Sequence, residues 1–179
     1  MHLSEALKQK RDKILSVWIE RTLDSYISSG FFKQSKDRFA NPVGANIKEG
    51  LSCLFTALLK GVEPKEYAES LDQVIRIRAV QDFTPAQAVA PILELKWVVK
   101  QVFSADKECR PLLAELDSFD CDVDRAALVA FDLYMESRDR LHKARIRELK
   151  SGSYILTDSA CASAVVRQNL QEVSQISKH

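Results

Sequence analysis

Four aspartates lie close together in the stretch DSFDCDVD, at positions 117, 120, 122 and 124. Clustered carboxylates are the ligands that Ca²⁺ prefers, and the EF-hand loop arranges them in a fixed pattern. An EF-hand beginning at Asp120 would need glycine at position 125 and glutamate at position 131, where this chain has Arg125 and Phe131. The cluster precedes a long helical pattern, so we expect these carboxylates to cap that helix and to complement its dipole.

Histidine and cysteine offer little for catalysis or for metal binding. The histidines are His2, His142 and His179, and they form no H-E-x-x-H motif and no Ser/His/Asp arrangement. Because no histidine lies between the first two, the middle of the chain has no proximal ligand for haem. No two cysteines form a C-x-x-C pair. We therefore predict no enzyme activity, no metal and no cofactor, with reduced and mostly buried thiols at Cys53, Cys109, Cys121 and Cys161.

The segment RIRAVQDFTPAQAV, residues 76–89, places two arginines in an apolar helical run. Residues two apart on a helix point about 200° away from each other, so Arg76 and Arg78 cannot share a face. Arg78 falls on the apolar stripe and is the candidate for burial. A buried guanidinium needs a carboxylate or several carbonyls, and the possible acids are Asp37, Asp72 and Asp82. Such a pair would either clamp a helix junction or line an anion-binding or interaction pocket.

Charge is balanced over the chain. The formal net charge is +1, so no overall field recruits nucleic acid or an anionic membrane. The basic run at residues 138–150 contains the i,i+4 pairs Glu136/Arg140 and Asp139/Lys143, which suit an exposed helix face. We interpret this run as a solvated or dimer-facing helix, with His142 in solvent, and predict no nucleic-acid partner.

Helical periodicity and end signals indicate an all-α chain. Pro42 and Pro85 each follow a capping residue, and Thr84 with Gln87 can form a capping box. Pro91 lies inside a helical pattern and removes the hydrogen bond to the Gln87 carbonyl, which predicts a kink. Helices are expected at residues 4–29 (ended by Gly30), 41–61, 64–81, 84–104, 111–116 and 122–150, with an irregular connection at 31–40.

The final segment differs from the rest. Residues 151–179 are rich in Ser, Ala and Gln, and we expect a tail that is disordered or ordered by a partner. Residues 1–150 are expected to form one helical domain. The chain starts without a signal-peptide apolar core and has no apolar run of about 20 residues, so we predict a soluble, cytoplasmic protein without membrane insertion.

The segments DRFANPVG (37–44) and RIRAVQDFTPAQAV (76–89) together resemble the signature of the RsbRD N-terminal domain family. These are sensor domains of RsbT co-antagonist proteins in bacterial stress signalling. Trp18 and the stretch LELKWVV (93–99) also fit, and the resemblance spans roughly residues 7–104. It implies an all-α regulatory module, with related sensor domains similar to globins that have lost haem. Such proteins usually carry a C-terminal output domain. Nothing of that size follows Lys150, so we expect a stand-alone sensor.

We predict a globin-like or related helical bundle with a long C-terminal helix. It would act as a non-catalytic sensory module in bacterial signalling, bind a protein partner and form a homodimer. Residues expected to couple the loop before the second helix to the third and fourth helices are Asp37, Arg76, Arg78 and Gln81. The alternative is a carrier of small apolar ligands such as lipids or fatty acids, with a cavity lined by Phe39, Phe55 and Trp97.

Overall fold

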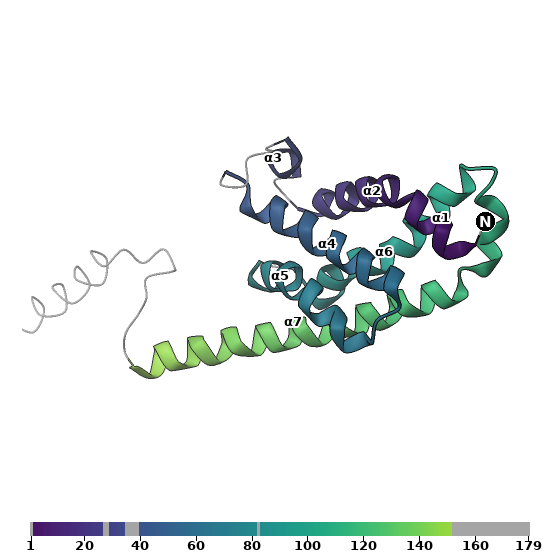
Figure 1. Ribbon diagram of the computed structural model, residues 1–179. Helices are drawn as coiled ribbons and strands as arrows, with labels where there is room; N and C mark the ends of the chain where they lie inside the picture. The colour runs from purple at the N-terminus through teal and green to yellow at the C-terminus, as the bar shows by residue number, and fades with distance from the viewer. Residues whose placement is uncertain (1, 27–28, 35–39, 82, 152–179) are drawn as a thin grey trace, which may run out of the picture. The chain divides into compact units, whose positions relative to one another are not determined.

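The computed structural model describes residues 2–26, 29–34, 40–81 and 83–151, and these residues form helices and no strand. Figure 1 shows the α-helices in chain order. Contacts divide the chain into two units, Met1–Asp139 and Arg140–His179. The helices are α1 (Leu3–Gln9), α2 (Arg11–Asp24), α3 (Ser29–Gln34), α4 (Pro42–Lys60), η1 (Pro64–Glu66), α5 (Tyr67–Val80), α6 (Pro85–Ser104), η2 (Arg110–Glu115) and α7 (Asp117–Ser151).

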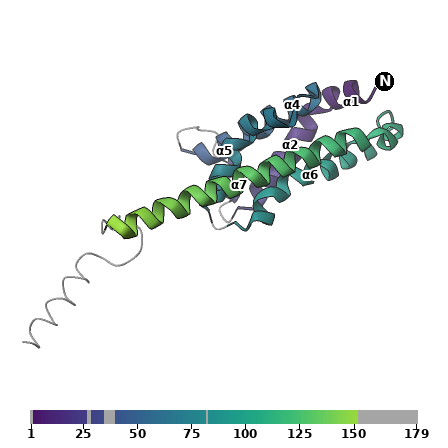
Figure 2. The ribbon, with the colours of Figure 1, turned by 90° about the horizontal axis from the view of Figure 1, so that it is seen from below.

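The first unit is a helical bundle around one apolar core. Helix α4 packs on α5, and α2 packs on both α6 and α4, as the two views of Figures 1 and 2 agree. Ion pairs from Lys96 to Asp124 and from Lys100 to Asp120 tie α6 to α7. The largest apolar side chains without solvent exposure include Trp18, Phe55 and Phe103. The predicted all-α fold with a long C-terminal helix is confirmed, whereas its globin-like character stays a prediction.

Local end signals place several helix termini as the sequence predicts. The Asn41 side chain accepts a hydrogen bond from the Gly44 amide at 2.8 Å, with Pro42 in the first turn of α4. Gly61 ends α4 with φ of 62°, a left-handed conformation that glycine adopts without a steric penalty. Thr84 forms the predicted capping box with Gln87 at the start of α6. These ends follow from residues close in sequence.

The prediction of one helix over residues 4–29 is wrong. The helix breaks at Lys10, whose φ and ψ of −92° and 6° separate α1 from α2. Lys10 forms an ion pair with Asp106, in the connection after α6, and α1 buries Leu7 in the core. Gly30 ends no helix, because it lies inside α3, whose last four residues fall in the segment expected to be irregular. Contacts distant in sequence decide this region, and no local breaker marks the position of Lys10.

The acidic cluster lies within α7 and not ahead of it. Helix α7 begins at Asp117, five residues earlier than predicted, so the other three aspartates occupy its first turns. They face basic side chains, since Asp120 and Asp124 pair with α6 and Asp122 pairs with Arg125 at 3.0 Å. Asp117 and Asp120 retain the expected place in the first turn, where a negative charge complements the helix dipole.

Two further predictions concern exposure. Of the three cysteines within the described residues only Cys109 is buried, while Cys53 and Cys121 are exposed, so the expectation of mostly buried thiols is wrong there. No helix in the described ranges combines the length and the hydropathy that a bilayer-spanning segment needs. In the second unit, the described turns of α7 expose Leu141, Ile146 and Leu149. The predicted tail at 152–179 lies outside the described residues.

Candidate functional site

The candidate site is the corner where α5 ends and α6 begins. Helix α5 stops at Val80, and Gln81 caps its end in an extended conformation. Thr84 then starts α6: its backbone amide donates to the Gln87 side chain at 2.9 Å, and its hydroxyl accepts from the Gln87 amide. Gln81 and Thr84 therefore mark the end of α5 and the start of α6, and the two helices pack on each other.

Arg78 is fully buried at this corner, as its place on the apolar stripe predicts. Its Nη2 atom donates to the Gln87 carbonyl at 2.8 Å, and its Nη1 atom donates to the Ser25 hydroxyl at 3.0 Å. The Gln87 carbonyl is the one that loses its helical partner to Pro91, because proline has no N–H. The guanidinium thus replaces the hydrogen bond that proline removes, while α6 continues through Pro91.

The expected carboxylate partner is not among the acids that the structure describes. Asp72 pairs with Arg76 at 2.8 Å on the outer side of α5, while Asp37 and Asp82 lie outside the described residues. The Arg76 side chain is 54% exposed, so the two arginines do lie on different faces. Arg76 is a solvated residue with an i,i+4 partner, and only Arg78 enters the corner.

Two aromatic rings, whose planes lie at 77° to each other, contact the buried guanidinium. The Arg78 guanidinium carbon lies 4.1 Å from the centre of the Phe83 ring and 4.9 Å from that of Tyr26. Such stacking stabilises a desolvated cation through the negative faces of the rings. Burial raises the pKa of Tyr26 above its ordinary value, an effect that the neighbouring Arg78 charge opposes. The charge of Arg78 is therefore stabilised by ring faces, a hydroxyl and a carbonyl.

Polar groups at the corner are incompletely paired. Within the described ranges, the Nε atom of Arg78, the hydroxyl of Tyr26 and the Oε1 atom of Gln81 are buried without a hydrogen-bond partner. Unpaired buried polar atoms are rare in native proteins, and each one costs free energy. Two of these atoms belong to Arg78 and to Tyr26, whose ring contacts the guanidinium, so they adjoin the buried charge.

Side chains from α2 and α7 donate hydrogen bonds to backbone carbonyls around the same corner. Trp18 donates from its indole N–H to the Pro91 carbonyl at 2.6 Å. The Tyr134 hydroxyl donates to the Phe83 carbonyl, and Arg138 donates to the Ala79 carbonyl at 3.1 Å. Sequence reasoning missed Tyr134 and Arg138 as site residues. Their i,i+4 spacing on the inner side of the long helix was the available signal, although spacing alone names no partner.

The structure describes two of the three residues expected to line an internal cavity, Phe55 and Trp97. Phe55 is fully buried in the core, where its ring packs edge-on against Phe119. Trp97 is 46% exposed on the surface of α6, with the Arg21 guanidinium 4.3 Å from its ring centre. Phe39 lies outside the described residues. The structure thus places Phe55 and Trp97 in different surroundings.

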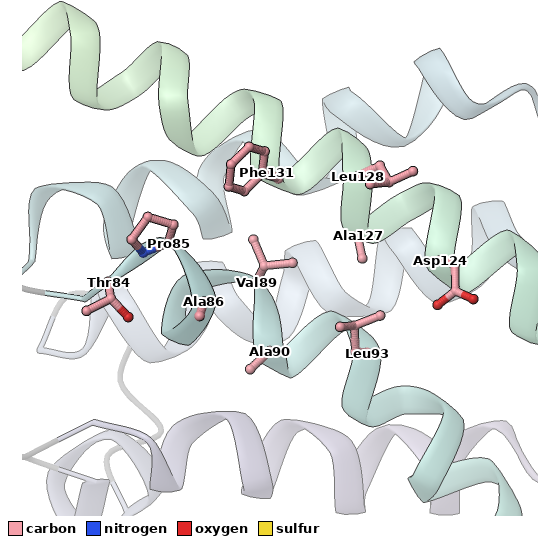
Figure 3. Close-up of a pocket in the computed structure, with 10 residues that line it drawn as sticks. All are labelled: Thr84, Pro85, Ala86, Val89, Ala90, Leu93, Asp124, Ala127, Leu128 and Phe131. Carbon is pink, nitrogen blue, oxygen red and sulfur yellow. The ribbon is translucent and has the colours of Figure 1, made fainter.

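An apolar groove runs beside the corner, between α6 and α7. Its volume is about 900 Å³. Figure 3 shows Pro85, Val89 and Leu93 along α6, and Ala127 and Phe131 along α7. Asp124 is the single charged residue of its lining, and it already pairs with Lys96. The α6 wall begins at the capping box, so the groove and the Arg78 corner share the first turns of α6.

Among the residues that the structure describes, the corner and the groove are lined mainly by apolar and aromatic side chains. Over the described part of the chain, no cluster of three or more His, Cys, Asp or Glu residues could hold a metal ion. At the corner, burial raises the pKa of the Tyr26 hydroxyl above its ordinary value. The arrangement is suited to holding helices in register.

Comparison with known proteins identifies the family. No curated protein and no solved structure matches the chain. The family model of the RsbT co-antagonist protein rsbRD N-terminal domain matches residues 12–149, which include the Arg78 corner, the groove and most of α7. The match covers well over half of the chain and agrees with the resemblance of residues 37–44 and 76–89. The chain therefore belongs to the family of RsbT co-antagonist protein rsbRD N-terminal domains.

Proposed function

We propose that this protein is a non-catalytic sensory module, which works in the cytoplasm by contact with another protein chain. Membership of the rsbRD N-terminal domain family supports a role as a regulatory sensor domain in signalling. The observation that carries the proposal is the shared segment at the start of α6. This segment holds the acceptor for the buried Arg78 and also forms one wall of an exposed apolar groove.

The proposed mechanism is a shift between two positions of the α6 start. Arg78 holds the Gln87 carbonyl from one side, and Tyr134 holds the Phe83 carbonyl from α7. If a signal changes either hydrogen bond, Pro85 and Val89 move with the backbone, and the width of the groove changes. A population shift of this kind needs a different free energy for the signal in the two arrangements, and no chemical step.

Incomplete pairing at the corner supports such a shift. Arg78 Nε, Tyr26 Oη and Gln81 Oε1 are buried without partners among the described residues, so a movement of the corner that paired one of these atoms would gain a hydrogen bond. A second arrangement that paired some of these atoms would lie close in free energy. Of the residues that the sequence proposed for coupling, Arg78 and Gln81 fit this role, whereas Arg76 lies outside it.

A carrier of small apolar ligands is the second candidate. The groove supports it, because a site of about 900 Å³ with almost wholly apolar lining could hold an acyl chain. The lining differs from the one expected from the sequence, since Leu93 and Phe131 would take the places assigned to Phe55 and Trp97. The two candidates differ in what occupies the groove.

A photo-crosslinking amino acid at Leu128, beside the groove, tests the proposal in host cells. We expect a discrete protein product from Leu128 and none from Glu69, an exposed control position on α5. An Arg78→Lys background should reduce the yield, because a lysine cannot hold both acceptors in the fork geometry of arginine. Absence of a protein product, together with lipid copurifying in native mass spectrometry, would contradict the sensory module and favour the carrier.

A further inference from the structure

Helix α7 carries a row of exposed apolar side chains beside the groove. Leu128, Phe131 and Met135 are 67%, 43% and 48% exposed. Their i, i+3, i+7 spacing puts them on one face of the helix. Across the groove, α6 exposes Leu93 and Trp97, which are one turn apart on a single face. We name these five residues the α6–α7 patch.

The area of the α6–α7 patch suits a stable protein interface. Large side chains bury about 150–250 Å² each, so five that are roughly half exposed leave about 500 Å² of apolar surface. This is near the upper end of what monomers expose and is most of the roughly 800 Å² that each partner gives to a standard interface. Small residues (Ala86, Ala90 and Ala127) line the groove next to the protruding Leu128. A ridge beside a hollow is a shape that a second copy can complement.

The charges beside Leu128 indicate the direction in which α7 of a second copy would run. Arg125 precedes Leu128 by three residues, and Asp132 follows it by four. Being seven residues apart, the two charges lie on the same side of α7. Arg125 is 61% exposed while it pairs with Asp122, and Asp132 is exposed with no ion pair found in the described part of the chain. Opposite charges thus flank Leu128 at similar distances.

We infer that the partner of the groove is a second copy of this chain, with its α7 antiparallel to the first and crossing it at Leu128. An antiparallel crossing places Arg125 of each copy beside Asp132 of the other, which gives two symmetry-related ion pairs around the apolar contact. Leu128 of each copy then packs toward the alanine-lined groove of its partner. This inference rests on the proposed function in one respect, that the groove is a protein contact surface.

Charge-reversal variants of the full-length chain test the antiparallel crossing, with the dimer dissociation constant measured by analytical ultracentrifugation. We expect the wild type to dimerise, and Arg125→Asp and Asp132→Arg each to weaken the dimer by about tenfold or more, because each puts like charges together. The double variant should recover the wild-type dissociation constant within a few-fold. Glu69→Arg, with the same charge change on α5, should leave the constant unchanged. Circular dichroism on each variant verifies that the fold is retained.

Three outcomes would overturn the inference. A wild-type protein that stays monomeric up to about millimolar concentration has no such dimer, since standard interfaces bind far more tightly. Single reversals without effect would remove the charge argument. Weakening by both single variants without recovery in the double variant would exclude the antiparallel crossing. If the chain is monomeric while Leu128 still crosslinks to another protein in cells, this inference fails and the sensory function stands.

Discussion

Replacement of Arg78 by methionine tests the central structural claim. Methionine keeps much of the unbranched stem and removes the guanidinium, so packing is disturbed less than by alanine. The change removes a hydrogen bond from a charged donor to Ser25 and leaves the Gln87 carbonyl buried without a partner. A charged hydrogen bond contributes about 1.5–3 kcal/mol, and an orphaned carbonyl costs about 1–3 kcal/mol. Stacking on Phe83 adds about 1 kcal/mol.

The free energy of unfolding should therefore fall by about 3–5 kcal/mol, given that these contributions overlap. Urea denaturation followed by circular dichroism measures the loss. Arg76→Met is the matched control, because it is the same substitution on the exposed face of the same helix. Arg76 forms only an exposed i,i+4 pair with Asp72, so its replacement should cost about 0.5 kcal/mol or less. Equal costs for the two variants would mean that burial of Arg78 carries no special stabilisation.

A double-mutant cycle with Pro91→Ala isolates the carbonyl. Alanine restores an N–H at position 91, which can bond the Gln87 carbonyl within α6. In that background Arg78→Met no longer orphans this acceptor, so its cost should fall by about 1 kcal/mol or more. An identical cost of Arg78→Met in both backgrounds would refute the argument that arginine compensates for proline.

Three further variants test other parts of the fold. Thr84→Ala removes the capping box of α6 and should destabilise the protein by about 1 kcal/mol in urea denaturation, whereas no loss would show that the cap is redundant. Gly50→Ala would place a Cβ against Val74 Cγ2 and 3.0 Å from the Ser70 carbonyl, so Val74 must shift or α4 and α5 must separate. We expect a loss of about 1–3 kcal/mol, and an unchanged midpoint would contradict this close packing. The ion pair with Lys10 lowers the pKa of Asp106 to about 2 from its usual 3.8. The pair thus stabilises the fold above pH 3.8, and this contribution is lost as the pH falls through 2. By thermal melts, Asp106→Asn should consequently be less stable than the wild type at pH 6, and the difference should shrink as the pH falls from 4 to 2, where Asp106 is about half protonated. A difference that stays unchanged down to pH 2 would exclude the ionised carboxylate as its source.

Local chemistry made much of the secondary structure predictable. Asn41 with Pro42, Gly61, and Thr84 with Gln87 mark helix ends through groups within a few residues, and the structure has those ends where expected. The break at Lys10 carries no such mark. Its position depends on Asp106, which is close in space and distant in sequence.

The candidate site divides in the same way. The apolar stripe of α5 predicted that Arg78 is buried and that Arg76 lies elsewhere, and the helical pattern around Pro91 predicted a free Gln87 carbonyl. Periodicity did not show that these two features satisfy each other, nor that Tyr134 and Arg138 of α7 hold the same corner. The sequence analysis also placed Phe55 and Trp97 in one cavity, whereas Phe55 lies in the core and Trp97 lies at the surface.

The sequence by itself determined that the chain is helical, where most helices start and end, and which arginine leaves the solvent. These properties depend on residues within about one or two helical turns of each other, and those distances are set by the backbone. Tertiary structure alone decided the partners of Arg78, the break at Lys10 and the groove between α6 and α7. A hydrogen bond or an apolar contact joins whatever the packing of whole helices brings within reach, and separation along the chain does not specify that packing.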